Sequence, residues 1–252
     1  MTTVRFFGHI HPKANRLTLN NPLRIDYRDS ERGRTIVILI GVVESSITVT
    51  CECPDYTDGD HVFLWIRATD FARACVNVFA FSQGVGLIVL LDKWQRDLGD
   101  VADIVFNDPA LPGLVTAYNI DGDITEVTKL IMGNPKLFLA IDDLIVSLTT
   151  AHTAVVNSYR AVEAIRHRLA APGDNATQMW EKLRSRLNVD RKYVQFVADA
   201  STESRHGNRV WIDGATTREV HHRAWKIMNR YLELVRRKIE SLPEAEFPLL
   251  AG

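Results

Sequence analysis

The feature that most constrains the fold of this chain is a change in the spacing of its apolar residues close to residue 134. Before this point apolar and polar residues alternate, for example over 4–11 and 47–53, as in strands with one buried face. Beyond it, apolar residues recur every three or four positions, as along one side of a helix. We therefore expect a β-rich domain over residues 1–133 and a helical domain over residues 134–252.

The first domain is predicted to be an antiparallel sheet with one helix packed against it. The stretch 35–43 is continuously apolar and β-branched, which is typical of a strand buried on both faces. Together with the alternating segments and the stretches 61–67 and 85–91, it gives about six or seven strands. Thr69 is the expected N-cap of the helix, which ends at Gly84. Because most turns are short, we expect an antiparallel sheet and an α+β fold.

The helical domain is predicted to begin with Asn134 as an N-cap and Pro135 at the first helical position. Its apolar stripe over 137–169 fits either one helix of about 35 residues or two helices joined near 149–150. Three further helices follow along the chain. Four helices with short connections predict an antiparallel four-helix bundle.

The net charge of −1 conceals a difference between the two predicted domains. Residues 1–133 carry 12 Lys and Arg against 17 Asp and Glu, whereas residues 134–252 carry 18 against 14. Five of the eight histidines also lie in the second domain. This asymmetry suggests that an anionic partner would bind the helical domain, although two ordinary solvated surfaces would give the same numbers.

Cysteine content and hydropathy indicate the compartment. Cys51, Cys53 and Cys75 cannot all pair within one chain, which suits a reducing cytoplasm better than an oxidising compartment. The apolar runs are shorter than the ~18 residues that a membrane span needs. The N-terminus lacks the charged start and apolar stretch of a secretion signal. We therefore expect a cytoplasmic protein that makes no contact with a membrane.

The motif with most chemical content is the loop 204–208, which contains Arg205, His206 and Gly207 between two predicted helices. Metal-independent RNA cleavage needs an acid–base group beside a cation. His206 would deprotonate a 2′-hydroxyl or protonate the leaving oxygen, and Arg205 would stabilise the phosphorane. The alternative is structural: Arg205 and His206 would bind carbonyls at the end of the third helix, with Gly207 as its left-handed stop.

Five further residues are candidate ligand-binding groups. Asn208, Arg209 and Trp211 belong to the same loop, and Trp211 could stack on a base. Glu163 and Arg160 share a polar edge of the first long helix. Glu163 would support the site if it faced a loop arginine, and the alternative is an ordinary pair on the helix surface with Arg160 or Arg166.

Metal and cofactor sites are weakly indicated. His9 with His11, and Cys51 with Cys53, could compose a zinc site if their strands were neighbours in matching register. The usual role of such cysteines is that of small buried hydrophobes, so we predict no metal. The chain contains no GxxxxGK[ST], GxGxxG or GxSxG motif, which disfavours the familiar nucleotide hydrolases, dehydrogenases and serine esterases. We expect no cofactor.

Residues 134–241 resemble a HEPN domain, a helical nucleic-acid-associated fold of many bacterial defence and toxin proteins. The resemblance depends on residues 158–163 of a long early helix, on Arg205, His206 and Gly207, and on the long final helix. In catalytic HEPN domains four to six residues separate an Arg from the His that follows it, and a symmetric dimer joins two such motifs into one ribonuclease site. Here positions 199–201 hold Asp, Ala and Ser, and Arg205 is adjacent to His206 instead.

Two functional hypotheses follow. In the first, a HEPN-like protein of a bacterial defence or toxin system dimerises through its helical domain and binds RNA or a nucleotide at Arg205 and His206. It would then be a degenerate, metal-independent endoribonuclease. In the second, the protein is a non-catalytic dimeric assembly or sensor that uses the helical domain only as an interaction module.

Overall fold

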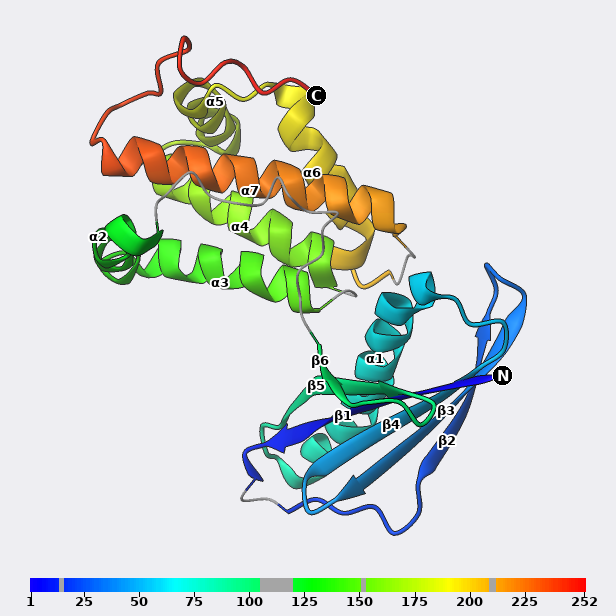
Figure 1. Ribbon diagram of the computed structural model, residues 1–252. Helices are drawn as coiled ribbons and strands as arrows, with labels where there is room; N and C mark the ends of the chain where they lie inside the picture. The colour runs from blue at the N-terminus through cyan, green and yellow to red at the C-terminus, as the bar shows by residue number, and fades with distance from the viewer. Residues whose placement is uncertain (14–15, 105–119, 151–152, 209–211) are drawn as a thin grey trace. The chain divides into compact units, whose positions relative to one another are not determined.

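The computed structural model describes residues 1–13, 16–104, 120–150, 153–208 and 212–252, without the side chains of 120–124. The chain forms two compact units, Met1–Asn107 and Asp108–Gly252 (Figure 1). The first unit contains a sheet and the second contains helices, so the predicted α+β class is confirmed. None of the described helices is both long enough and apolar enough to cross a membrane.

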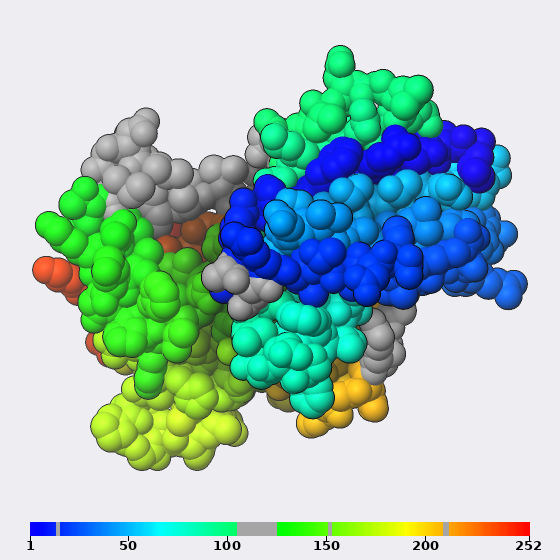
Figure 2. All heavy atoms as spheres, turned by 90° about the horizontal axis from the view of Figure 1, so that it is seen from below, coloured from blue at the N-terminus to red at the C-terminus, as the bar shows by residue number. Residues whose placement is uncertain are grey.

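The first unit is an antiparallel sheet of six strands in the order β2-β3-β4-β1-β5-β6. In the space-filling view the dark-blue β1 lies between the green β5 and the lighter blue β4 (Figure 2). The long helix α1, His61–Gln83, packs on one face of the sheet through Leu64, Ala68, Ala72 and Val76. The strands are β1 Thr2–His11, β2 Leu23–Asp29, β3 Arg34–Val43, β4 Ser46–Cys53, β5 Ile88–Arg96 and β6 Ala102–Asp103.

The prediction of a strand over 61–67 was wrong, because these residues form the first two turns of α1. The helix starts early since Asp60, directly before it, is fixed by buried interactions. Its carboxylate accepts hydrogen bonds from the guanidinium of Arg34 and from the backbone and hydroxyl of Thr57. Thr69, the expected N-cap, lies buried inside the helix, whereas the predicted end at Gly84 is confirmed by its left-handed φ of 64°.

The second unit contains six helices within its described residues. Asn134 caps α3 by accepting a hydrogen bond from the backbone N–H of Leu137, with Pro135 at the first helical position, as predicted. The helices are α2 Ile120–Met132, α3 Pro135–Thr149, α4 Ala154–Leu169, α5 Ala176–Leu187, α6 Arg191–Arg205 and α7 Gly214–Arg236.

The helix count differs from the predicted four-helix bundle, which is not confirmed. The stripe over 137–169 forms two helices, α3 and α4, so the second of the two alternatives is correct. Helix α2 contacts α3 and belongs to the second unit, which begins at Asp108 rather than after residue 133. The core of this unit is built around α4, which packs against α3, α5, α6 and α7. Its inward side chains are Val155, Tyr159, Val162, Ile165 and Leu169.

Candidate functional site on helix α4

The segment 205–208 forms the C-terminal cap of α6. Gly207 has a φ of 83°, and its N–H donates to the carbonyl of Ser204 at 3.3 Å. The N–H of Asn208 donates to the carbonyl of Glu203 at 3.0 Å. These two bonds define a Schellman motif, in which a left-handed residue satisfies the last carbonyls of a helix. The structural interpretation of Gly207 as the stop of this helix is therefore confirmed.

Arg205 and His206 are consecutive residues at this cap, and both are exposed. The guanidinium of Arg205 lies 4.0 Å from the centre of the Tyr159 ring and donates to the hydroxyl of Thr202 at 3.3 Å. The described contacts of the Arg205 guanidinium are thus with a hydroxyl and a ring, and not with the helix-end carbonyls of the structural alternative. The exposed Asn208 donates to the Glu203 carboxylate at 2.7 Å. Arg209 and Trp211 lie outside the described residues.

Arg205 belongs to a cluster that continues along α4, which we call the cation–aromatic cluster. The hydroxyl of Tyr159 donates to Oε1 of Glu163 at 3.3 Å, and Arg166 donates to the same oxygen at 3.0 Å. The guanidinium of Arg166 lies 4.7 Å from the ring of Trp180. Burial raises the pKa of Tyr159, and the adjacent Glu163 carboxylate raises it further. The members of the cluster are Tyr159, Glu163, Arg166, Trp180 and Arg205.

The Glu163 carboxylate accepts hydrogen bonds from two neighbours on α4, Tyr159 and Arg166. The carboxylate pairs with Arg166 three residues later, as the helix-surface alternative required. Its connection to Arg205 runs through Tyr159, whose hydroxyl donates to Glu163 and whose ring lies under the Arg205 guanidinium. Glu163 therefore positions the side chain of Tyr159, and the ring of Tyr159 in turn contacts the guanidinium of Arg205.

A groove of about 230 Å³ lies between α3 and α4, and we call it the α3–α4 groove. Arg160, one of the predicted ligand-binding residues, has a largely exposed side chain (61%) that pairs with Asp143 at 3.5 Å. Burial raises the pKa of Asp143, and the guanidinium of Arg160 opposes this rise. The residues that line the groove are Lys136, Leu139, Asp143, Arg160, Glu163, Ala164 and His167.

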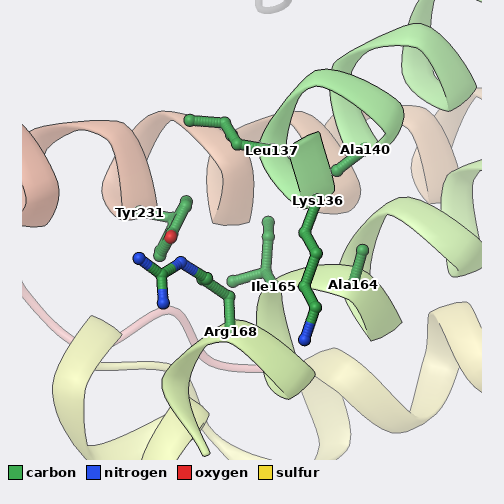
Figure 3. Close-up of a pocket in the computed structure, with 7 residues that line it drawn as sticks. All are labelled: Lys136, Leu137, Ala140, Ala164, Ile165, Arg168 and Tyr231. Atoms are coloured by element: carbon green, nitrogen blue, oxygen red, sulfur yellow. The ribbon is translucent and has the colours of Figure 1, made fainter. Parts of the chain in front are cut away.

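Figure 3 shows the neighbouring contact between α3, α4 and α7. Lys136 extends from the first turn of α3 toward α4, on the side of Ala164. The guanidinium of Arg168 lies near the hydroxyl of the buried Tyr231. Lys136 therefore reaches the groove with its flexible ammonium group, while Arg168 is directed to the other side.

The cation–aromatic cluster and the groove form one continuous surface, because Glu163 belongs to both. Tyr159, Arg160, Arg166 and His167 each lie three or four positions from Glu163 and so flank it on α4. The surface combines four permanent cations, Lys136, Arg160, Arg166 and Arg205, with two carboxylates, Asp143 and Glu163. It is suited to an anionic ligand.

Lys136, Asp143 and His167 were not predicted from the sequence as members of this site. The helical spacing of Arg160 and His167 around Glu163 could have indicated a shared face. Lys136 and Asp143 could be added only by pairing α3 with α4, and the two-helix alternative for 137–169 was left open.

The candidate zinc ligands do not converge. In the antiparallel register of β1 and β4, Cys51 lies opposite Val4, and His9 lies opposite Ser46. Cys51 and Cys53 are buried on the core face, and His9 and His11 alternate with the core residues of β1. Burial, with a smaller effect from Cys53, raises the pKa of Cys51 to about 12, as expected for a thiol that acts as a small hydrophobe.

Comparisons with known proteins agree with the two units. Residues 4–105 match the N-terminal domain, and residues 124–236 the C-terminal domain, of a family described as a domain of unknown function, DUF8168. No curated protein and no solved structure matches the chain. These findings leave the HEPN resemblance as a prediction. Because the two matched ranges fall within the two units and together span most of the sequence, the chain belongs to the DUF8168 family and carries both of its domains.

Proposed function

We propose that the second unit is a HEPN-like domain that binds RNA or a nucleotide at the exposed pair Arg205 and His206. The observation that carries this proposal is the position of the pair at the end of α6, next to a surface rich in permanent cations. Arg205 is already held on the face of Tyr159. A preoriented guanidinium loses less side-chain entropy when it binds a phosphate, which favours the interaction.

The same pair supports a metal-independent cleavage step. His206 would remove the proton from a 2′-hydroxyl, the 2′-oxygen would attack phosphorus, and the 5′-oxygen would leave with a proton from a second acid. Arg205 would stabilise the charge of the phosphorane. One imidazole cannot be base and acid in the same step. The symmetric dimer implied by the HEPN resemblance would supply the second acid as His206 of another copy.

One observation favours the second hypothesis, a non-catalytic dimeric assembly or sensor. Phe138, Ile145 and Leu148 form an exposed apolar stripe on α3, separated by seven and three positions. Exposed apolar patches often mark protein–protein contacts. A dimer through this helix would serve either function, so only the RNA experiment separates them.

The test uses the intact chain with mixed RNA in EDTA, and compares wild type with His206→Ala and Arg205→Ala. Wild-type cleavage should fall by about 10²-fold or more in His206→Ala, as for loss of an acid–base group. Arg191→Ala removes an exposed cation from the start of the same helix and should leave cleavage unchanged. Salt-dependent RNA affinity, measured in parallel, reports binding without cleavage.

Each result of this test has a defined meaning. Cleavage or binding that depends on both residues supports the proposal. A protein that neither cleaves nor binds RNA or nucleotides refutes it, and a stable dimer in light scattering would then favour the assembly function. If Arg191→Ala lowered RNA cleavage or affinity as much as Arg205→Ala, the effect would come from net charge. That result would also contradict the proposed role of Arg205 and His206.

A further inference from the structure

The α3–α4 groove retains positive charge after its internal pairs are formed. Glu163 is neutralised from outside the groove, because Arg166 and the Tyr159 hydroxyl donate to its Oε1. Asp143 is offset by Arg160 across 3.5 Å, yet most of the Arg160 side chain remains exposed. Lys136 is exposed and makes no ion pair with any residue that the structure describes. The groove thus offers Lys136 and the outer donors of Arg160 to a ligand.

The positions of Lys136 and Arg160 favour an anion that has more than two acceptor oxygens. Lys136 extends from α3, whereas Arg160 belongs to α4, so cationic donors line the groove from two helices. The exposed His167 also lines it, but its Nε2 accepts from Arg166 at 2.8 Å, which leaves only Nδ1 to donate. A ligand carboxylate has only two oxygens, and one arginine can bond to both of them. A terminal phosphate has three oxygens and can accept from the Arg160 fork and from the Lys136 ammonium together.

The size and walls of the groove favour a small ligand with an organic part. Its volume of about 230 Å³ lies just below the ~300 Å³ at which sites for drug-sized ligands begin. It is several times the ~30 Å³ that one water molecule occupies in the liquid. Leu139 and Ala164 give it an apolar wall. We propose that the α3–α4 groove binds a phosphate monoester, with the phosphate on Lys136 and Arg160 and the attached sugar or base against Leu139.

This site is distinct from the pair proposed for RNA. Neither Arg205 nor His206 is among the residues that line the groove, and the described contacts connect Arg205 to it through Tyr159 and Glu163. The proposal therefore survives if the loop has no activity on RNA, and it can fail while the loop remains active.

The experiment is a calorimetric titration of the intact chain with adenosine 5′-monophosphate, inorganic phosphate and adenosine. We expect the monophosphate to bind, adenosine to bind undetectably, and inorganic phosphate to bind more weakly than the monophosphate. Lys136→Gln and Arg160→Gln should each weaken binding of the monophosphate at least tenfold. Arg191→Gln removes the same charge from an exposed position outside the groove and should change affinity less than twofold.

Two further measurements complete the test. His206→Ala should bind the monophosphate as wild type does, because it lies outside the groove. An RNA oligomer with a terminal phosphate, compared with the same oligomer without it, distinguishes an RNA end from a free nucleotide as the source of the phosphate. Equal thermal midpoints show that the variants fold, as expected for two exposed side chains.

The proposal is overturned if wild type does not bind the monophosphate, or if the two groove variants bind it as tightly as wild type. It is also overturned if Arg191→Gln weakens binding as much as Arg160→Gln, which would show attraction to net charge only. Loss of binding in His206→Ala would place the ligand on the loop and would likewise reject the groove.

Discussion

The guanidinium of Arg205 lies over the ring of Tyr159, 4.0 Å from its centre, and this contact joins the end of α6 to the middle of α4. Such cation–π contacts contribute about 0.5–1 kcal/mol at exposed sites. The buried ring is fixed in turn by its hydrogen bond to Glu163. The orientation of an exposed cation is therefore controlled by a buried aromatic residue that the ligand need not touch.

Two substitutions of Tyr159 separate these contributions. Tyr159→Phe keeps the ring under Arg205 and removes only the hydrogen bond to Glu163, so we expect a loss of about 1 kcal/mol in unfolding free energy. Tyr159→Leu also removes the ring, so it should weaken RNA affinity as much as Arg205→Ala does. Urea denaturation and RNA titration measure the two effects. If Tyr159→Leu bound RNA like wild type, the ring would have no part in orienting Arg205.

Gly207 should resist substitution for a backbone reason alone. Its φ of 83° lies in the left-handed region, and an added Cβ would meet no atom within 4 Å. Gly207→Ala should therefore cost about 1 kcal/mol through conformational strain and not through a clash. Gly214→Ala is the matched control, since its Cβ also meets open space and no positive φ is present. It should be neutral or slightly stabilising at the start of α7. Equal melting temperatures for both variants would contradict this account.

The sequence predicted well those features that depend on neighbouring residues. The alternating strands, the cap at Asn134, the end of α1 at Gly84 and the role of Gly207 all follow from local backbone chemistry. The start of α1 could not be predicted from local residues. It depends on the hydrogen bond that Arg34 donates to Asp60, which lies 26 residues later in the chain. A run of apolar residues from 62 to 66 has no clear period, so pattern alone could not distinguish a strand from a helix.

The candidate site shows the same limit. Arg160 and Glu163 could be placed on one edge of a predicted helix from spacing alone. Their ion-pair partners could not be predicted in this way. Arg160 pairs with Asp143, which lies on the preceding helix, and Glu163 pairs with Arg166 and not with Arg160. Arg205 was singled out for its neighbour His206, whereas its structural contact is Tyr159, 46 positions earlier.

Arg230 should be essential for the position of the C-terminal segment. Its buried guanidinium donates to the carbonyls of Leu187, Asn188 and Pro248, and no carboxylate accepts from it among the described residues. Arg230→Met would leave these acceptors without their donor, so we expect a loss of about 3 kcal/mol. Limited proteolysis after residue 240 should accelerate. Arg237→Gln, which breaks the solvent-screened pairs of Arg237 with Glu233 and Glu246, should cost far less than Arg230→Met. Similar losses in both variants would contradict the role of Arg230.

His221 should make the second unit less stable in acid. Burial lowers its pKa to about 4, and its Nε2 has no hydrogen-bond partner among the described residues. The unfolded chain, with an ordinary histidine pKa near 6.5, takes up a proton between pH 6.5 and 4, whereas the folded chain stays neutral. Stability is therefore full above pH 6.5 and falls as the pH decreases toward 4, by up to about 3 kcal/mol.

The contribution of His221 can be isolated by comparing wild type with His221→Leu in urea denaturation at pH 7.5, 5.5 and 4.5. The other ionisable groups are common to both proteins, so the difference in unfolding free energy reports residue 221 together with its coulombic interaction with the adjacent His222. This difference should shift in favour of the leucine variant as the pH falls. A difference that stays constant across the three pH values would mean that His221 binds its proton equally well in both states, and burial would then not control its charge.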